Sequence, residues 1–186
     1  MLEIAGSSII GGLIILMILQ ANITITNSVY YHTLNTVNQM NLTTIAQVID
    51  NDLKNAGYRV SDSIKIYSTD STNLCIRHDV DDNGIVDSVR YAAFPRRDSD
   101  ILTLKRIVNG NAATATEFPV TYFRVKFYDS NGRPTTYRSS VRLVKVAFTT
   151  ITEQVYAGEG EEGEEEAATN YTPVYWERLF RPRNLR

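Results

Sequence analysis

The residues best suited to chemistry are the acids of the segment DVDDNGIVD, residues 79–87. Oxygen-bearing side chains at alternate positions before a glycine are typical of the start of an EF-hand calcium loop, and here Asp79, Asp81 and Asn83 precede Gly84. Asp87, three residues after that glycine, is a further candidate ligand. The twelfth position of such a loop needs a bidentate acid, but Arg90 occupies it. The flanking residues also favour strands over helices. The segment therefore predicts an acidic hairpin turn without metal or cofactor, and calcium binding is the weaker alternative.

Two other segments concentrate charge of one sign. GEGEEGEEE at residues 158–166 is dense in glutamate, so self-repulsion predicts a flexible, solvated loop over residues 157–169. A divalent-ion or partner site there is the weaker alternative. Arg178, Arg181 and Arg183 lie close to aromatic residues, a pattern also found in proteins that bind single-stranded nucleic acid. The net charge of −2 and pI near 5.7 argue against that partner, so solvated arginines are expected.

The sequence indicates no active site. His32 and His78 are the only histidines, and neither belongs to an HExxH pattern or stands beside a cysteine cluster. No Ser-His-Asp arrangement and no phosphate-binding glycine loop can be assigned. Cys75 stands between Leu74 and Ile76, an apolar setting that predicts a buried, unreactive thiol. We therefore expect a protein that is not an enzyme.

The elements that position these residues begin with an apolar N-terminal segment. Ile4 to Leu19 contains no charged residue and spans roughly 24 Å as a helix. A membrane core of about 30 Å favours about 20 residues, and Ala21, Ile23 and Ile25 can extend the apolar surface. The segment predicts a transmembrane helix of marginal length, which suits a helix that can also leave lipid for a protein bundle. A cleaved signal sequence and a buried helix of a soluble protein are weaker alternatives.

Three residues of this helix are candidates for assembly. Glu3 is a carboxylate at the edge of an apolar segment, where it must stay at the headgroup level or pair with a cation. Gly11 and Gly12 allow helix backbones to approach closely within a membrane. A pairing acid beside small residues indicates that the helix can bundle with others.

The remaining pattern predicts an α+β fold. Residues 1–26 form the transmembrane or filament-core segment, and residues 27–57 continue it as an amphipathic helix that Gly57 ends. Residues 58–186 form an antiparallel β domain, because short apolar runs alternate with turn residues. Strands are expected at residues 63–67, 74–80, 85–94, 101–108, 121–128, 141–151 and 176–180. Their loops are too short for crossover helices.

Several of these segments together resemble type IV pilin-like proteins, and within them W-type minor pilins and J-type pseudopilins of type II secretion. The resemblance rests on IDNDLKNAGY at residues 49–58, DVDDNGIVDSVRY at 79–91, FPVTYFRVKFYDSNG at 118–132 and WERLFRPRNLR at 176–186. It implies a pilin-like fold in which the long N-terminal helix packs on the β domain. Glu3 corresponds in role, not in position, to the glutamate near the start of the family's mature chains.

The resemblance implies a structural subunit of a type IV pilus or type II secretion-type filament. Its partners would be inner-membrane lipid before assembly and homologous subunits, through bundled N-terminal helices, afterwards. The β domain would lie outside the cytoplasm, in a periplasmic or cell-surface filament. The residues alone leave two other functions open. One is a single-pass anchored binding or sensor domain that does not polymerise. The weaker one is an enzyme, for which only the turn from Asp79 to Asp87 offers a convergent acidic site.

Overall fold

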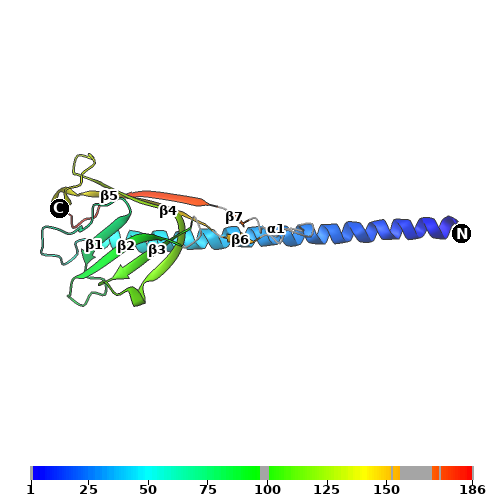
Figure 1. Ribbon diagram of the computed structural model, residues 1–186, viewed down its shortest axis with the longest axis horizontal. Coiled ribbons are helices and arrows are strands. Elements are labelled where there is room, and N and C mark those ends of the chain that lie inside the picture. The colour runs from blue at the N-terminus through cyan, green and yellow to red at the C-terminus, as the bar shows by residue number, and fades with distance from the viewer. Residues whose placement is uncertain (1, 97–100, 152, 156–168, 172, 186) are drawn as a thin grey trace. The chain divides into compact units, whose positions relative to one another are not determined.

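The computed structural model describes residues 2–96, 101–151, 153–155, 169–171 and 173–185, with the backbone alone for residues 2–7, 153–155 and 169–171. One helix precedes an antiparallel sheet, as Figure 1 shows. The elements are α1 (Leu2–Asn55), β1 (Asn73–His78), β2 (Asp87–Pro95), β3 (Leu102–Val108), η1 (Ala112–Thr114), β4 (Thr116–Tyr128), η2 (Arg138–Ser140), β5 (Leu143–Thr150), β6 (Glu153–Val155), β7 (Thr169–Tyr171) and β8 (Val174–Phe180). The chain divides into two compact units, Met1–Val37 and Asn38–Arg186.

The helix α1 has no proline and is rich in Ile, Leu, Asn and Thr. Its threonines are poor helix formers, yet five of their hydroxyls, those of Thr24, Thr33, Thr36, Thr43 and Thr44, donate to backbone carbonyls within the helix. Thr24 donates to the carbonyl of Gln20 at 2.9 Å, and Thr33 donates to that of Val29 at 2.9 Å. The helix ends at Asn55, and Gly57 follows with φ of 83°, a left-handed conformation that glycine adopts without strain. The expected end of the helix is thereby confirmed.

The main sheet has six strands in the order β1-β2-β3-β4-β5-β8, and each strand pairs antiparallel with its neighbour. The first hairpin pairs Leu74 with Tyr91 and His78 with Asp87, and its turn contains Asp82 and Gly84 at positive φ. This confirms the hairpin expected around Asp82–Gly84. The strands β6 and β7 pair antiparallel in a separate two-stranded sheet.

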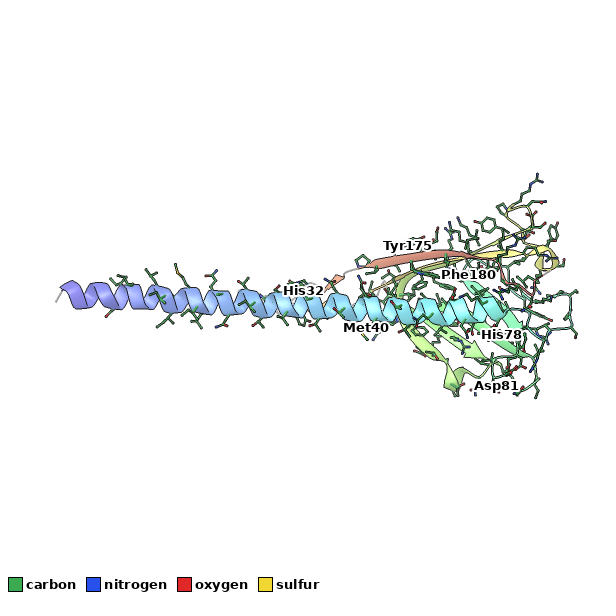
Figure 2. The ribbon with its side chains drawn as sticks, turned by 180° about the vertical axis from the view of Figure 1, so that it is seen from behind. His32, Met40, His78, Asp81, Tyr175 and Phe180 are labelled. Atoms are coloured by element: carbon green, nitrogen blue, oxygen red, sulfur yellow. The ribbon has the colours of Figure 1, made fainter. Side chains whose placement is uncertain are left out.

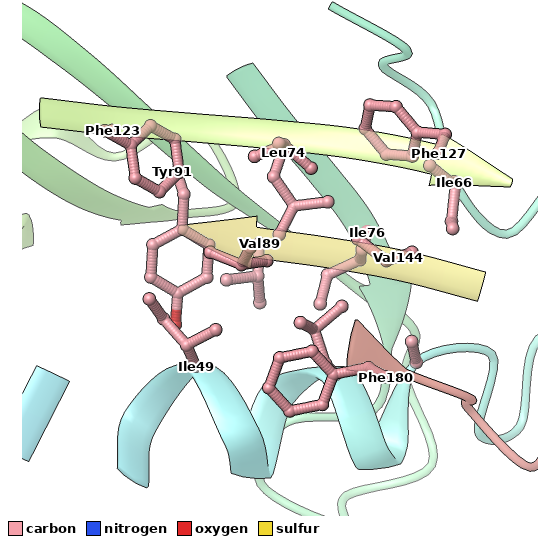
Figure 3. Close-up of a cluster of buried hydrophobic side chains, with 14 of the residues drawn as sticks. Ile49, Ile66, Leu74, Ile76, Val89, Tyr91, Phe123, Phe127, Val144 and Phe180 are labelled. Atoms are coloured by element: carbon pink, nitrogen blue, oxygen red, sulfur yellow. The ribbon is translucent and has the colours of Figure 1, made fainter. Parts of the chain in front are cut away.

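The core of the second unit lies between the last turns of α1 and one face of the sheet. Ile45, Ile49 and Leu53 are fully buried, which confirms this part of the predicted amphipathic face. Alternate residues of β1 point inward, as expected for a sheet with one covered face. Figure 3 shows Ile49 and Phe180 beside Leu74, Ile76, Val89 and Val144 of the sheet. The predicted α+β architecture is therefore the observed one.

Two details of the prediction change. The strand expected at residues 63–67 is wrong, because this segment contributes only a single bridge between Ile66 and Ile76. Ile66 is buried in the core. The backbone on either side of it makes isolated hydrogen bonds to β1 and does not form a full strand. The strands β6 and β7 had no signal in the sequence. Residues 157–168 of the predicted acidic loop lie outside the described residues.

Candidate functional site

The first unit exposes apolar side chains around the helix. Large hydrophobic residues from Ile9 to Val29 are each more than half exposed, among them Ile10, Leu13, Leu16 and Met17. The helix is long and apolar enough to cross a membrane. A surface of this composition is stable only when lipid or other apolar groups cover it, because exposing it to water costs roughly 25 cal/mol per Å². The observed helix therefore fits a single-pass anchor.

The three residues predicted for assembly lie on this helix. Gly11 and Gly12 lie in open space, since a Cβ at either position would meet nothing within 4 Å. No close packing inside the described part of this chain therefore requires glycine there. Glu3 is helical, but its side chain lies outside the described residues.

The acidic turn brings three of its predicted residues together. One carboxylate oxygen from each of Asp79, Asp81 and Asp87 lies within 4.8 Å of the others, which is close enough to hold a metal ion. Asp79 and Asp87 are buried, and Asp81 is exposed. Asn83, the fourth candidate, donates its amide to Asp81 at 2.9 Å and accepts from the backbone of Ile85 at 2.7 Å.

These acids already have hydrogen-bond partners. Asp79 accepts from Arg59 at 2.7 Å and from the backbone N–H groups of Gly84 at 2.8 Å and Asn83 at 3.1 Å. Asp87 accepts from the N–H of Val80 at 3.0 Å. It also accepts from the side chain of Asn109 at 2.6 Å. The carboxylates therefore hold the turn itself, and a metal ion would have to displace some of these donors.

The Arg59 side chain supplies a positive charge to the acidic turn. The Arg59 guanidinium contacts Asp79 at 2.7 Å and Asp82 at 3.0 Å. Burial alone would raise the pKa of Asp79, but the bonds from Arg59 and from two backbone N–H groups outweigh it and lower that pKa. Arg90, the residue at the twelfth loop position, bonds to Asn73 on the neighbouring strand at 3.2 Å. The geometry thus supports a structural turn in which Arg59 balances the charge.

A buried polar cluster that the sequence did not predict joins α1 to the sheet. The Asp52 side chain is 2% exposed and accepts from Tyr91 at 2.5 Å and from Arg106 at 2.7 and 3.0 Å. His78 Nε2 lies 3.6 Å from the same carboxylate. Figure 3 shows the Tyr91 hydroxyl directed toward α1. Asp52 is three residues after Ile49 and one before Leu53, so its place within the apolar run was the available signal.

The cluster has the electrostatics of a satisfied buried ion pair. Burial would raise the pKa of Asp52, but nearby His78 and the bonds from Arg106 and Tyr91 outweigh it and lower that pKa. The carboxylate bond raises the pKa of Arg106 in turn. Burial raises the pKa of the Tyr91 hydroxyl, and the adjacent carboxylate adds to that effect. Asp52 and Arg106 are therefore held as a charged pair that fixes the helix on strands β2 and β3.

The histidines and the cysteine do not combine into a site. His32 is exposed on α1, whereas His78 is buried at the end of β1, and the two belong to different units (Figure 2). Cys75 is half-buried, and burial raises the pKa of its thiol. A raised thiol pKa disfavours the reactive thiolate.

A charged groove lies where α1 ends and the chain leaves β8. Its lining includes Asp50, Lys54, Arg178, Arg181 and Arg183. Asp50 pairs with Lys54 at 2.5 Å and with Arg178 at 2.9 Å. The arginines, which the sequence predicts to be solvated, gather beside the end of the helix.

Comparison with protein-family models, with curated proteins and with solved structures finds no match for this chain.

Proposed function

We propose that this chain is a structural subunit of a type IV pilus or type II secretion-type filament, similar to a minor pilin or pseudopilin. The proposal rests on one feature, which is that the two parts of α1 differ in their surroundings. Its first part exposes apolar side chains, and its last turns form the core of an antiparallel sheet. The acidic turn and the buried cluster around Asp52 have structural explanations, which supports a non-enzymatic role.

The exposed apolar surface supports both stages of such a function. Before assembly, inner-membrane lipid covers residues such as Ile10, Leu13 and Leu16, and the chain is a single-pass protein with its β domain outside the cytoplasm. In the filament, the same residues pack against the helices of homologous subunits. Lipid is as apolar as leucine, so the exchange depends on close packing, and the open surface at Gly11 and Gly12 permits it.

Glu3 supplies the specificity of this exchange. A carboxylate moved into a helix bundle carries a large desolvation cost unless a cation accompanies it. No lysine or arginine precedes Lys54 in the sequence. The cation that Glu3 meets in the bundle therefore comes from a neighbouring subunit. In the anchored monomer, Glu3 stays hydrated at the headgroup level.

The Glu3→Ala variant tests this function. Expression, membrane insertion and the melting curve of the β domain should match those of the wild type, since Glu3 lies in the other unit. Incorporation into fibres should fall severalfold, measured by immunogold labelling of native surface fibres or of fibres sheared from cells. Glu117→Ala is the matched control, because this exposed acid pairs only across the sheet surface with Lys105 at 2.5 Å.

Three outcomes decide the matter. Loss of incorporation in Glu3→Ala but not in Glu117→Ala supports assembly through the helix. Equal incorporation of Glu3→Ala and wild type contradicts the role given to Glu3. If the protein is membrane-anchored but no fibre carries it under any growth condition, the anchored binding or sensor domain replaces the filament subunit.

A further inference from the structure

The strand β8 leaves one side of its backbone open. It is the last strand in the order of the main sheet, where it pairs with β5. Alternate residues of an antiparallel strand direct their N–H and C=O groups to opposite sides, so about three of its seven residues direct them away from the sheet. No backbone hydrogen bond reaches that side from the residues that the structure describes. Figure 2 shows this strand, with Tyr175 and Phe180, at the edge of the sheet.

The opposite edge of the sheet is covered by the chain itself. Tyr67 donates its N–H to the carbonyl of Cys75 at 2.8 Å, and Arg77 donates to that of Lys65 at 3.0 Å. Gly57 in turn donates to the carbonyl of Arg77 at 2.8 Å. An exposed edge is a template for pairing with another chain. Among the described residues nothing covers β8 in this way, so β8 is the open edge of this sheet.

A groove with an excess of positive charge lies along the end of this strand. It is formed by the last turns of α1, the end of β8 and the residues that follow, and its volume of about 520 Å³ is within the usual range of binding sites. We call Lys54, Arg178, Arg181 and Arg183 the basic groove. The acid in its lining is Asp50, which pairs with both Lys54 and Arg178. Arg181 and Arg183 are exposed, and neither makes an ion pair with a described residue.

The edge and the groove together favour an extended acidic polypeptide as the ligand. The outward N–H and C=O groups of an edge strand are both satisfied by another backbone, whereas a phosphate group offers no donors for the C=O groups. A guanidinium binds a carboxylate with two parallel hydrogen bonds, so Arg181 and Arg183 can each hold one acidic side chain. Four cations against one acid leave a local excess of positive charge, although the whole chain has a net charge of −2.

The charges of β8 itself do not oppose such a ligand. Glu177 is its one acid, and it accepts from the hydroxyl of Tyr175 at 2.8 Å and pairs with Lys145 of β5 at 2.6 Å. Arg178 is the next residue, so its side chain lies on the other face of the sheet, where it reaches Asp50 of α1. The acid of the strand is therefore neutralised on one face, and the face toward α1 carries the cation.

We propose that the free edge of β8 and the basic groove together bind an extended acidic segment of a partner protein. The segment adds one strand to the sheet, and its acidic side chains bind Arg181 and Arg183. In this mode of recognition backbone hydrogen bonds supply affinity and side-chain contacts supply specificity. The inference goes beyond the filament function and does not depend on it, because an anchored binding domain would carry the same edge and groove.

The first test measures binding of a labelled synthetic peptide to the full chain in detergent micelles, by fluorescence anisotropy. Glutamate alternates with threonine in this peptide of about ten residues, enough to cover a strand of seven. Binding should saturate and should weaken as salt is raised. The Arg181→Gln/Arg183→Gln double variant should bind about tenfold more weakly, because two exposed ion pairs are lost. Its matched control, Arg124→Gln/Lys126→Gln, removes the same charge from exposed positions of β4 and should change affinity less than about twofold.

The second test asks whether the peptide pairs with β8 as a strand. Two further peptides carry N-methyl groups on the backbone, one at every glutamate and the other at every threonine. Alternate residues of a strand face its partner, so one of the two peptides should lose binding and the other should keep it. Amide hydrogen exchange of residues 174–180 should slow when the unmethylated peptide binds, whereas exchange in β1 should stay unchanged.

Several results would overturn the inference. Absence of saturable binding shows that the groove does not take such a segment, and equal weakening by both double variants shows that the peptide senses net charge alone. Undiminished binding of a peptide with glutamine in place of glutamate shows that carboxylates are not recognised. Equal behaviour of the two methylated peptides shows that β8 is not the docking edge.

A competition experiment addresses the other class of anion. Displacement of the peptide by single-stranded DNA at a lower concentration than by unlabelled peptide shows that the groove binds phosphate, which also overturns the inference. The peptide variants leave the protein unchanged, so their results do not depend on how the double variants fold. None of these outcomes affects the Glu3→Ala experiment.

Discussion

Replacing Asp52 by asparagine removes the negative charge at the centre of the buried cluster with little change in volume. The Asp52 side chain is 2% exposed and that of Arg106 is 17% exposed, so the loss leaves a guanidinium nearly out of water without its counter-ion. The asparagine amide also places donors opposite the donors of Arg106 and Tyr91. At most one carbonyl oxygen remains to accept the three bonds that now reach the carboxylate.

The expected cost is about 3 kcal/mol of unfolding free energy. Breaking a buried ion pair by removing one partner costs about 3–5 kcal/mol, and asparagine keeps one acceptor, which places the estimate at the lower end. Asp50→Asn is the matched control on the same helix. Asp50 pairs with Lys54 and Arg178, which are 63% and 53% exposed, so its loss should cost under about 1 kcal/mol.

The measurement is urea denaturation of a fragment lacking residues 1–27, followed by circular dichroism. This fragment retains the whole unit Asn38–Arg186 and should fold without detergent. The Asp52→Asn/Arg106→Met double variant should lose less unfolding free energy than the two single variants lose in sum. Each single change leaves the other partner buried without its counter-ion.

The pH dependence gives an independent check. The folded pKa of Asp52 lies below its ordinary value of 3.8. A depressed pKa contributes stability that is fully present above the unfolded value and is lost as pH falls through the folded value. The difference in unfolding free energy between wild type and Asp52→Asn should therefore be constant near neutral pH and shrink below about pH 4. A cost under 1 kcal/mol at pH 7, or additive double-variant energies, would refute the assignment of a coupled buried pair.

Two further predictions concern the core and the acidic turn. Ile49→Ala should lower the unfolding free energy of the same fragment by about 2–5 kcal/mol in urea denaturation, since Ile49 is fully buried, and a negligible shift would contradict its core position. Calcium titrated into the wild type by calorimetry should show no binding tighter than about 1 mM, since Arg59 already neutralises Asp79 and Asp82. Arg59→Gln, which frees these acids, should bind calcium more tightly, and strong binding by the wild type would show that the ion displaces Arg59.

The sequence by itself determined the features that depend on neighbours along the chain. The apolar helix, its end at Gly57 and the hairpin at Asp82–Gly84 follow from periodicity and from residues that tolerate positive φ. The strand that pairs Leu74 with Tyr91 was predictable for the same reason, since a short turn fixes both partners. Ser63 to Tyr67 misled the prediction because strand propensity cannot show whether a partner strand is within reach.

The tertiary structure alone decided which distant charges meet. Asp52 and Arg106 are 54 residues apart, and Arg59 and Asp79 are 20 apart, so no local pattern couples them. Packing of α1 on the sheet brings the first pair together and removes it from water, which turns two ordinary surface residue types into a buried ion pair. The fold likewise gathers Lys54 and Arg178 around Asp50, although 124 residues separate the two cations. The energy of such contacts depends on burial and distance, and a linear sequence specifies neither until the core has formed.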